Sequence, residues 1–159
     1  MLILAWVGGL TLLTLLFQDA LVSRFNPNAK PLVQLAQNGR HEVVLERNAR
    51  GHYVASGSIN GRPVTFLLDT GATDVAVPED LADRLGLERS GGGISQTANG
   101  AVAVWRTTLG RVRLGSIELK GVSASIIPTM AAGDPVLLGM SFLRQVEFVQ
   151  SDGQLTLRL

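Results

Sequence analysis

The sequence contains no cysteine among its 159 residues, which excludes disulfides, thiolate zinc sites and a cysteine nucleophile. It also lacks an excess of charge of either sign, since 14 basic and 13 acidic residues give a formal net charge of +1. Binding to nucleic-acid phosphates needs clustered Lys and Arg, so we expect no nucleic-acid partner. The length allows one ordinary domain with an appendage and excludes two full-size domains in tandem.

Motifs for metals and cofactors are missing as well. The two histidines, His41 and His52, are not spaced as a pair of metal ligands. The run Gly91-Gly92-Gly93 lacks the strand and helix of a dinucleotide site, and no Lys-Ser or Lys-Thr follows it. We therefore expect neither a metal ion nor an organic cofactor.

One long apolar run opens the chain, from Leu2 to Phe17, and Asp19 is the one charged residue among the first 22. Sixteen helical residues reach about 24 Å, short of the roughly 30 Å hydrocarbon core, but a helix continued to Val22 is long enough to span it. No basic segment precedes the run and no A-x-A-like cleavage site follows it. We predict a retained transmembrane anchor over residues 1–22, with a cleaved signal peptide or a buried core helix as alternatives.

Residues 23–40 are predicted to be a flexible linker, because Asn26-Pro27 and Lys30-Pro31 precede a polar stretch. From His41 onward, short apolar stretches alternate with Gly, Asn and Pro, which is typical of an all-β domain over residues 41–159. The expected strands are 42–47, 53–59, 62–68, 101–109, 111–114, 117–119, 122–127, 146–150 and 155–159.

Turns and helices are indicated by local signals. Asn60-Gly61, Asn99-Gly100 and Asp152-Gly153 predict three hairpin turns. A proline, two acids and a closing glycine predict a short helix over 79–85, and a second brief helical turn is expected over 141–145. The predicted fold is therefore an all-β barrel with one or two short helices.

The segment with the clearest chemistry is Phe66-Leu67-Leu68-Asp69-Thr70-Gly71-Ala72-Thr73. Its apolar strand is expected to be buried on both faces, so that Asp69 emerges at the end of a rigid, dry element. Gly71 lets the backbone turn close to the carboxylate, so that an amide N–H can donate to it, and Thr70 adds a hydroxyl to the turn. Taken alone, an Asp-x-Gly turn at a strand end explains these letters equally well.

The longer stretch FLLDTGATDVAVP resembles the active-site segment of the aspartic proteases. The lack of a second copy indicates the retroviral-type branch, the retropepsins. The resemblance continues in Val136 and the apolar-apolar-glycine element Leu137, Leu138 and Gly139, which in this family packs beneath the catalytic loop. Residues 94–109 are positioned like the family's flap hairpin. The tip of that flap is expected at Ala98, Asn99 and Gly100.

The resemblance implies an aspartic endopeptidase with Asp69 as its catalytic residue and with Thr70, Gly71 and Ala72 supporting the active-site loop. Aspartic protease chemistry needs two carboxylates that share one proton. Because no other Asp-Thr-Gly or Asp-Ser-Gly exists here, the second Asp69 is expected from another copy of the chain, in a homodimer. An extended peptide is the expected substrate, and Leu155 to Leu159 are expected to contribute to the dimer interface.

The chain looks most like the bacterial membrane-anchored retropepsin-like proteins. That likeness implies a single pass through the inner membrane and a periplasmic protease domain, whereas Arg24 and Lys30 after the span favour the opposite orientation. A catalytically silent dimerisation or peptide-binding module that kept the barrel is the alternative function. The apolar residues expected to line substrate subsites are Val75, Val77, Ile94, Ala98 and Ile126.

Overall fold

The computed structural model describes residues 2–35, 39, 41–97 and 100–159, and most of its elements are strands. The helices are α1 (Leu2–Phe25), α2 (Glu79–Leu85) and α3 (Met140–Leu143). The strands are β1 (Leu32–Leu35), β2 (His41–Glu46), β3 (Val54–Ile59), β4 (Arg62–Leu68), β5 (Val75–Pro78), β6 (Gly91–Thr97), β7 (Gly100–Leu114), β8 (Ile117–Ile127), β9 (Val136–Leu138), β10 (Glu147–Ser151) and β11 (Gln154–Arg158). The prediction of a mostly β domain with few helices is confirmed.

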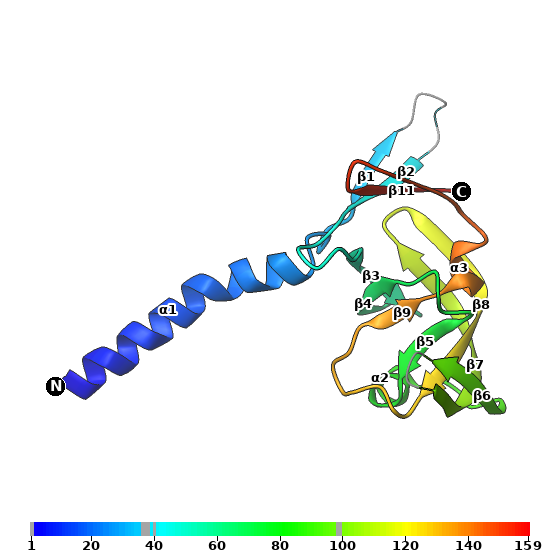
Figure 1. Cartoon of the computed structure of the whole chain (residues 1–159), viewed down its shortest axis with the longest axis horizontal. Helices are drawn as coiled ribbons and strands as arrows, with labels where there is room; N and C mark the ends of the chain where they lie inside the picture. Colours follow the sequence, from blue (N-terminus) through cyan, green and yellow to red (C-terminus); the bar gives the residue numbers. More distant parts are fainter. Residues whose placement is uncertain (1, 36–38, 40, 98–99) are drawn as a thin grey trace.

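The strands form two sheets (Figure 1). The larger has the order β3-β4-β9-β5-β8-β7-β6, and a further pairing between β3 and β7 closes six of these strands into a ring. The smaller has the order β1-β2-β11-β10. Within the named strands, β4 with β9 and β5 with β8 are the parallel pairs. These parallel pairs join segments far apart in sequence and bring the ends of β4 and β9 side by side.

The ring encloses the hydrophobic core. Phe66 on β4, Phe142 on α3 and Ile126 on β8 are fully buried within it. Strand β4 buries Val64 and Phe66, whereas Leu67 is half-buried. The expectation that this strand is buried on both faces is therefore wrong for one face, because alternate side chains of a strand point to opposite sides and one side here meets the core.

Two of the predicted hairpin turns are confirmed by their backbone angles. Asn60 and Gly61 have φ values of 51° and 81°, and Asp152 and Gly153 have 51° and 78°. Positive φ at both central residues is the geometry that matches the twist of the flanking strands. In the third turn, Asn99 lies outside the described residues. Strands β7 and β8 are each continuous where the sequence predicted two, because the glycines at 110 and 121 do not end them.

The smaller sheet contains β11 in an internal position, paired with β2 on one side and with β10 on the other. Arg158 on β11 forms ion pairs with both neighbouring strands, with Glu42 on β2 at 2.6 Å and with Glu147 on β10 at 3.8 Å. Leu155 and Leu157 are buried within the chain itself. Both edges of β11 are already hydrogen-bonded within the chain, and the contribution of Leu155 to Leu159 to a dimer interface stays a prediction.

The segment expected to be a linker contains β1, which pairs antiparallel with β2. Just before it, Asn28 is 4% exposed and is held by side-chain hydrogen bonds. Its Nδ2 donates to the carbonyl oxygens of Glu46 at 2.9 Å and Val54 at 2.8 Å, and its Oδ1 accepts from the Glu46 amide at 2.7 Å. A buried asparagine that satisfies backbone groups on two strands fixes this segment to the domain.

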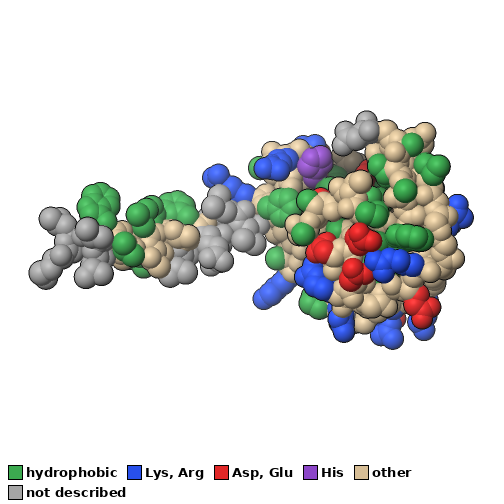
Figure 2. All heavy atoms as spheres, turned by 90° about the horizontal axis from the view of Figure 1, so that it is seen from below, with side chains coloured by type: hydrophobic (Ala, Val, Ile, Leu, Met, Phe, Trp, Pro, Cys, Tyr) green, Lys and Arg blue, Asp and Glu red, His purple; other side chains and the backbone are tan. Residues whose placement is uncertain are grey.

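Helix α1 extends away from the β domain (Figure 1). Its described large apolar side chains are exposed, among them Trp6, Leu10 and Phe17, and Figure 2 shows green side chains along it. In the part of the chain that the structure describes, no helix combines the length and the apolar character needed to cross a membrane. The helix predicted in this region is present as α1, Leu2–Phe25, but the predicted membrane span is not supported.

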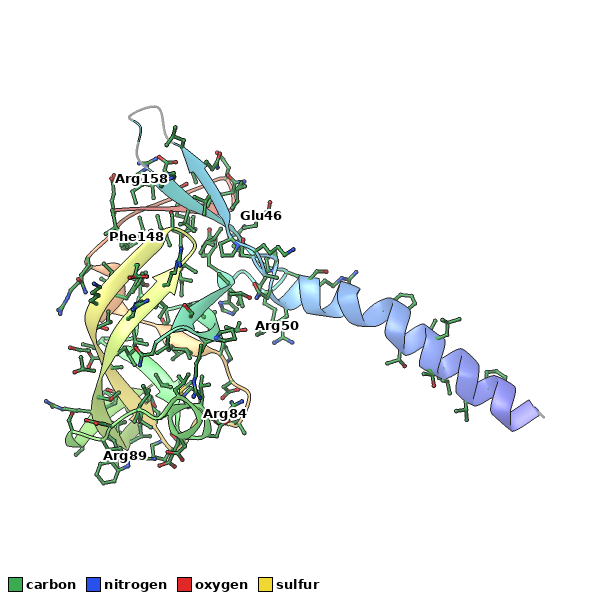
Figure 3. The ribbon with its side chains drawn as sticks, turned by 180° about the vertical axis from the view of Figure 1, so that it is seen from behind. Glu46, Arg50, Arg84, Arg89, Phe148 and Arg158 are labelled. Carbon is green, nitrogen blue, oxygen red and sulfur yellow. The ribbon has the colours of Figure 1, made fainter. Side chains whose placement is uncertain are left out.

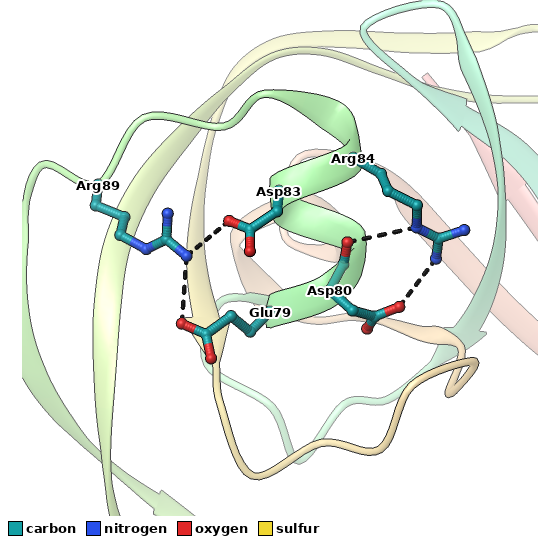
Figure 4. Close-up of polar contacts among 5 residues, drawn as sticks. All are labelled: Glu79, Asp80, Asp83, Arg84 and Arg89. Atoms are coloured by element: carbon teal, nitrogen blue, oxygen red, sulfur yellow. Dashed lines mark hydrogen bonds and ion pairs between the residues drawn. The ribbon is translucent and has the colours of Figure 1, made fainter.

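Helix α2 spans the predicted residues and ends at Gly86, whose φ of 67° is the left-handed value typical of a glycine cap. Arg89, beyond that cap, bonds Asp83 at 2.7 Å and Glu79 at 3.2 Å (Figure 4). Hydrogen bonds to Asp83 and, to a smaller extent, to Glu79 raise the pKa of Arg89 above its usual value. The ion pairs of Arg89 therefore tie the segment that leads into β6 to α2. Figure 3 shows Arg89 at the opposite end of the domain from Arg158.

Candidate active site

Asp69 lies where β4 ends, directly after Leu68. The Leu68 amide donates to the carbonyl oxygen of Tyr53 at 3.0 Å, and the Asp69 amide donates to that of Leu138 on the parallel strand β9 at 3.2 Å. The backbone of Asp69 is thus an extension of the sheet. An aspartate in that position has its main chain fixed by two neighbouring strands before its side chain makes any contact.

The side chain of Asp69 is held by the turn that follows it. The Gly71 amide donates to Asp69 Oδ1 at 2.8 Å, and the Ala72 amide donates to the Asp69 carbonyl oxygen at 3.2 Å. The predicted amide donor to the carboxylate is therefore present. A Cβ on Gly71 would lie 3.2 Å from Asp69 Oδ1, which is tighter than most real Cβ contacts. Glycine at 71 gives the carboxylate room beside the backbone.

The predicted element beneath this loop has the expected position. Leu137 and Leu138 on β9 pair with the last residues of β4, and Gly139 follows them. A Cβ on Gly139 would lie 2.2 Å from the carbonyl oxygen of Asp74 and 2.7 Å from that of Ala72. Contacts that short do not occur between real atoms, so glycine is required for its lack of a side chain. The chain can pass directly under the loop because of that absence.

The next residues fasten α3 to the loop. The Met140 amide donates to the Ala72 carbonyl oxygen at 2.8 Å, and the Ser141 amide donates to that of Thr73 at 2.9 Å. The loop at 69–74 therefore continues directly from β4 and is held by backbone hydrogen bonds to β9 and α3. Its shape depends on segments about seventy residues apart in sequence.

Ser141 supports the same site, although no sequence motif distinguishes it from the other serines. Its side chain accepts from the Val75 amide at 3.0 Å and donates to the Ser123 carbonyl oxygen at 2.7 Å. The residue is 2% exposed. One buried hydroxyl thus links α3 to β5, which follows the active-site loop in the chain, and to β8, which lies beside β5 in the sheet.

Asp69 lies on the wall of a groove of about 1070 Å³. Its apolar lining includes Ala76, Val104, Ile127 and Leu137, and hydroxyl groups come from β7 and β8. The described residues that line it are Asp69, Gly71, Ala72, Thr73, Asp74, Ala76, Ser90, Gly93, Ile94, Ser95, Gln96, Thr97, Val104, Arg106, Thr107, Thr108, Ser123, Ala124, Ser125, Ile127 and Leu137. A groove of this size admits an extended peptide segment.

The predicted subsite residues are mostly elsewhere. Ile94 lines the groove, but Val75, Val77 and Ile126 are fully buried in the core. On β5 the groove is lined by Ala76 instead. The physical reason is strand alternation, which places neighbouring side chains on opposite faces. Ala98, the fifth residue of that prediction, lies outside the described residues.

The structure places a β-hairpin where the flap is predicted, and its role as a flap stays a prediction. Strands β6 and β7 pair antiparallel from Gly91 opposite Arg106 to Thr97 opposite Gly100. Gly100 has a φ of 109°, which favours glycine. Asn99 and Ala98, at the predicted tip, lie outside the described residues. Ile94 and Thr97 of β6 line the groove, so this hairpin forms one of its walls.

The active-site loop is open to solvent in the single chain. Asp69 is half-buried, Ala72 is half-buried, and Thr70 and Gly71 are exposed. The expectation of a dry site is therefore not met by one copy of the chain alone. Among the described residues, no three His, Asp or Glu side chains gather as ligands for a metal ion. The chemistry that this loop offers is that of a positioned carboxylate beside a peptide-sized groove.

The part of the chain that contains this site matches a known protein family. The sequence model described as gag-polyprotein putative aspartyl protease matches residues 55–145. That match is more than half of the chain and contains both Asp69 and the glycine at 139. An uncharacterized protein in the cobV 5′ region of Sinorhizobium sp is 32% identical over 117 residues, which are 70% of this chain and 49% of that protein.

Two Rickettsia proteins are also similar. The uncharacterized protein RP867 of Rickettsia prowazekii (strain Madrid E) is 28% identical over 117 residues, covering 72% of this chain and 49% of the relative. The chain therefore spans about half the length of these curated relatives. The crystal structure of a retropepsin-like aspartic protease from Rickettsia conorii matches with a TM-score of 0.59 and 26% identity, covering 80% of this chain and 94% of that one.

Proposed function

This chain belongs to the retropepsin-like aspartic protease family, and from that premise we propose that it is an aspartic endopeptidase whose active site is completed by a second copy of the chain. The observation that carries the proposal is the Asp69 carboxylate, held by the Gly71 amide at 2.8 Å on the wall of a peptide-sized groove. A structural Asx turn contains the same hydrogen bond, so the catalytic interpretation is favoured by the groove beside the carboxylate and by the family.

The need for a second copy follows from the chemistry and the sequence together. Peptide hydrolysis by aspartates uses two neighbouring carboxylates that share one proton. Asp69-Thr70-Gly71 occurs once, and the other Asp-Gly pair, Asp152-Gly153, forms a hairpin turn in the smaller sheet. A two-fold axis beside the loop supplies the missing carboxylate at no cost in sequence. The exposure of Thr70 and Gly71 leaves that face of the loop open to a partner.

The reaction then proceeds without a covalent intermediate. The ionised Asp69 takes a proton from a water molecule, and the oxygen of that water bonds to the peptide carbonyl carbon. At the same time, the protonated Asp69 of the other copy gives its proton to the carbonyl oxygen. The tetrahedral diol collapses when the Asp69 that took the proton from water gives it to the amide nitrogen and the other Asp69 takes a proton from a diol hydroxyl, which breaks the carbon–nitrogen bond and restores the starting protonation. The groove orients the extended peptide, which removes much of the entropic barrier to attack.

The experiment is cleavage of a peptide mixture by the full chain, read by mass spectrometry from acidic to neutral pH. We expect cleavage by the wild type, inhibition by a pepstatin-like hydroxyl isostere, and loss of cleavage in Asp69→Asn. The matched control is Asp152→Asn, an Asp-Gly aspartate outside the groove, which keeps wild-type activity. Wild-type cleavage by Asp69→Asn contradicts the proposal, and a wild type that binds peptides without cleaving any supports the catalytically silent alternative.

The shared site has a quantitative signature in mixtures. When equal amounts of wild type and Asp69→Asn exchange protomers at random, about one quarter of the dimers carry two aspartates. At constant total protein, activity should then fall to about a quarter of the all-wild-type value. A site contained in one chain predicts a fall to about half, and that outcome contradicts the dimer.

The periplasmic location inferred from the family likeness stays a prediction. A reporter enzyme fused to the carboxyl terminus, in one version active only in the periplasm and in another only in the cytoplasm, measures the side on which the domain lies. Activity of the cytoplasmic version alone contradicts the prediction and agrees with the orientation favoured by Arg24 and Lys30.

A further inference from the structure

Arg106 is the one cation among the described residues that line the groove. Asp69 and Asp74 are the acids there, and the remaining lining side chains are neutral. Within the described part of the chain, no carboxylate lies within ion-pair distance of Arg106, whereas Arg111 on the same strand pairs with Glu118 at 3.7 Å. Arg106 is therefore a groove cation without an ion-pair partner in the described part of the chain, although the groove as a whole contains two acids.

The arginines that precede β6 have ion-pair partners. Arg84 pairs with Asp80 at 3.1 Å, and Arg89 pairs with both Asp83 and Glu79 (Figure 4). These acids belong to α2, and none of them is paired with Arg106.

The position of Arg106 is built into the hairpin. A Cβ on Gly93 would lie 3.3 Å from Arg106 Nε, so the arginine side chain passes over a place that the glycine leaves empty. The carbonyl oxygen of Arg106 accepts from the Ser90 amide at 2.8 Å and from the Ser90 hydroxyl at 3.0 Å. Ser125 lies opposite Arg106 on β8 and also lines the groove. The backbone of Arg106 is thus anchored, and its side chain passes over Gly93 on the wall of the groove.

We propose that Arg106 is a specificity-determining residue that selects peptides with an Asp or Glu side chain at the subsite beside Gly93, an inference that rests on the proposed function. A guanidinium donates two parallel N–H bonds to a carboxylate, a geometry that neutral side chains do not match. Arg106 is exposed, so this contact is partly solvated and weakens with added salt. A peptide with a basic residue at the same subsite is disfavoured by the same charge.

The test compares peptides that are identical except for one position, which carries Glu, Gln or Lys and is moved along the substrate. At pH 6 a Glu side chain is ionised, since its ordinary pKa is about 4.3. For the wild-type full chain we expect kcat/KM for Glu to exceed that for Gln about two- to fivefold at one position, and the ratio to shrink with added salt. Arg106→Gln should bring the ratio to about one, and Arg106→Glu should make Lys the preferred residue. The control is Arg111→Gln, on the same strand outside the groove, which keeps the wild-type ratio.

A purely structural role for Arg106 changes activity equally on all three peptides, and that result overturns the proposal. So does a wild type that cleaves all of them equally, or an acidic preference that persists in Arg106→Gln. If the wild type cleaves nothing, the proposed function fails, and the inference is still decided by peptide affinity, measured by fluorescence anisotropy. Tighter binding of the Glu peptide that is lost in Arg106→Gln supports the acidic subsite, and equal affinities contradict it.

Discussion

The Gly71 amide and the Asp69 carboxylate are joined by a hydrogen bond of 2.8 Å, and a Cβ on Gly71 would lie 3.2 Å from the same carboxylate oxygen. One residue thus supplies the donor that orients the proposed catalytic group and leaves the space in which that group sits. The contact is local, spanning two positions of the chain. It is also specific, because a larger residue at 71 keeps the donor and removes the space.

Gly71→Ala is expected to lower kcat about tenfold or more, because the added methyl group displaces the carboxylate by a few tenths of an ångström from its productive position. Stability should change little, since Gly71 is exposed and does not have a positive φ. Cleavage kinetics and thermal unfolding of the same preparation check both parts. Unchanged kcat, or a large loss of stability, contradicts this reading of the glycine.

Gly139→Ala is expected to destabilise the fold by about 1–3 kcal/mol or more, because the new Cβ collides with backbone oxygens that cannot rotate away. Urea unfolding followed by circular dichroism measures the change. Gly92→Ala is the matched control, since a Cβ there meets nothing within 4 Å. Equal urea midpoints for the two variants would show that the loop at 69–74 can shift to make room for a side chain at 139, which contradicts the prediction.

Ser141→Ala should cost about 1–3 kcal/mol of unfolding free energy, because the buried Val75 amide loses its acceptor. The loss should be accompanied by faster hydrogen exchange of that amide. Ser151→Ala serves as control, because its hydroxyl contacts the neighbouring Asp152 on the surface, and we expect a change within about 0.5 kcal/mol. A Ser141→Ala protein as stable as this control contradicts a structural role for the buried hydroxyl.

Asn28→Ala is expected to cost about 2–3 kcal/mol, because it leaves buried backbone groups on β2 and β3 without partners. Gln34→Ala, an exposed change on β1, is the comparison and should be nearly neutral. Denaturant unfolding measures both variants. If Asn28→Ala is also neutral, residues before β1 behave as the linker that the sequence predicted.

Features that depend on neighbouring residues were predicted correctly from the sequence. Helix α2 begins after Pro78 and ends at Gly86 as its capping residues indicate, and two Asn-Gly or Asp-Gly turns have the backbone angles that they favour. The Asp69 turn and the element at 137–139 also lie as the family resemblance implied. These features depend on interactions within a few residues, or on a motif long enough to identify its family.

Features that depend on distant partners were missed. Strand β1 exists because β2 is available to pair with it, and nothing in residues 32–35 alone distinguishes it from a linker. Ser141 is one serine among many until α3 packs against β5 and β8. The expected subsite valines on β5 lie in the core because the neighbouring alanine, Ala76, faces the groove, and the sequence pattern does not say which face is which.

The sequence by itself determined the family, the single Asp-Thr-Gly motif, and hence the need for a second carboxylate. Those conclusions rest on residue identity and on chemistry that does not change with context. Only the tertiary structure decided that β11 is paired on both edges, that the loop is open in one copy, and that Arg106 faces the groove without an acid beside it. Each of these depends on which distant segments bury one another, a free-energy balance summed over the whole domain that no short stretch of sequence contains.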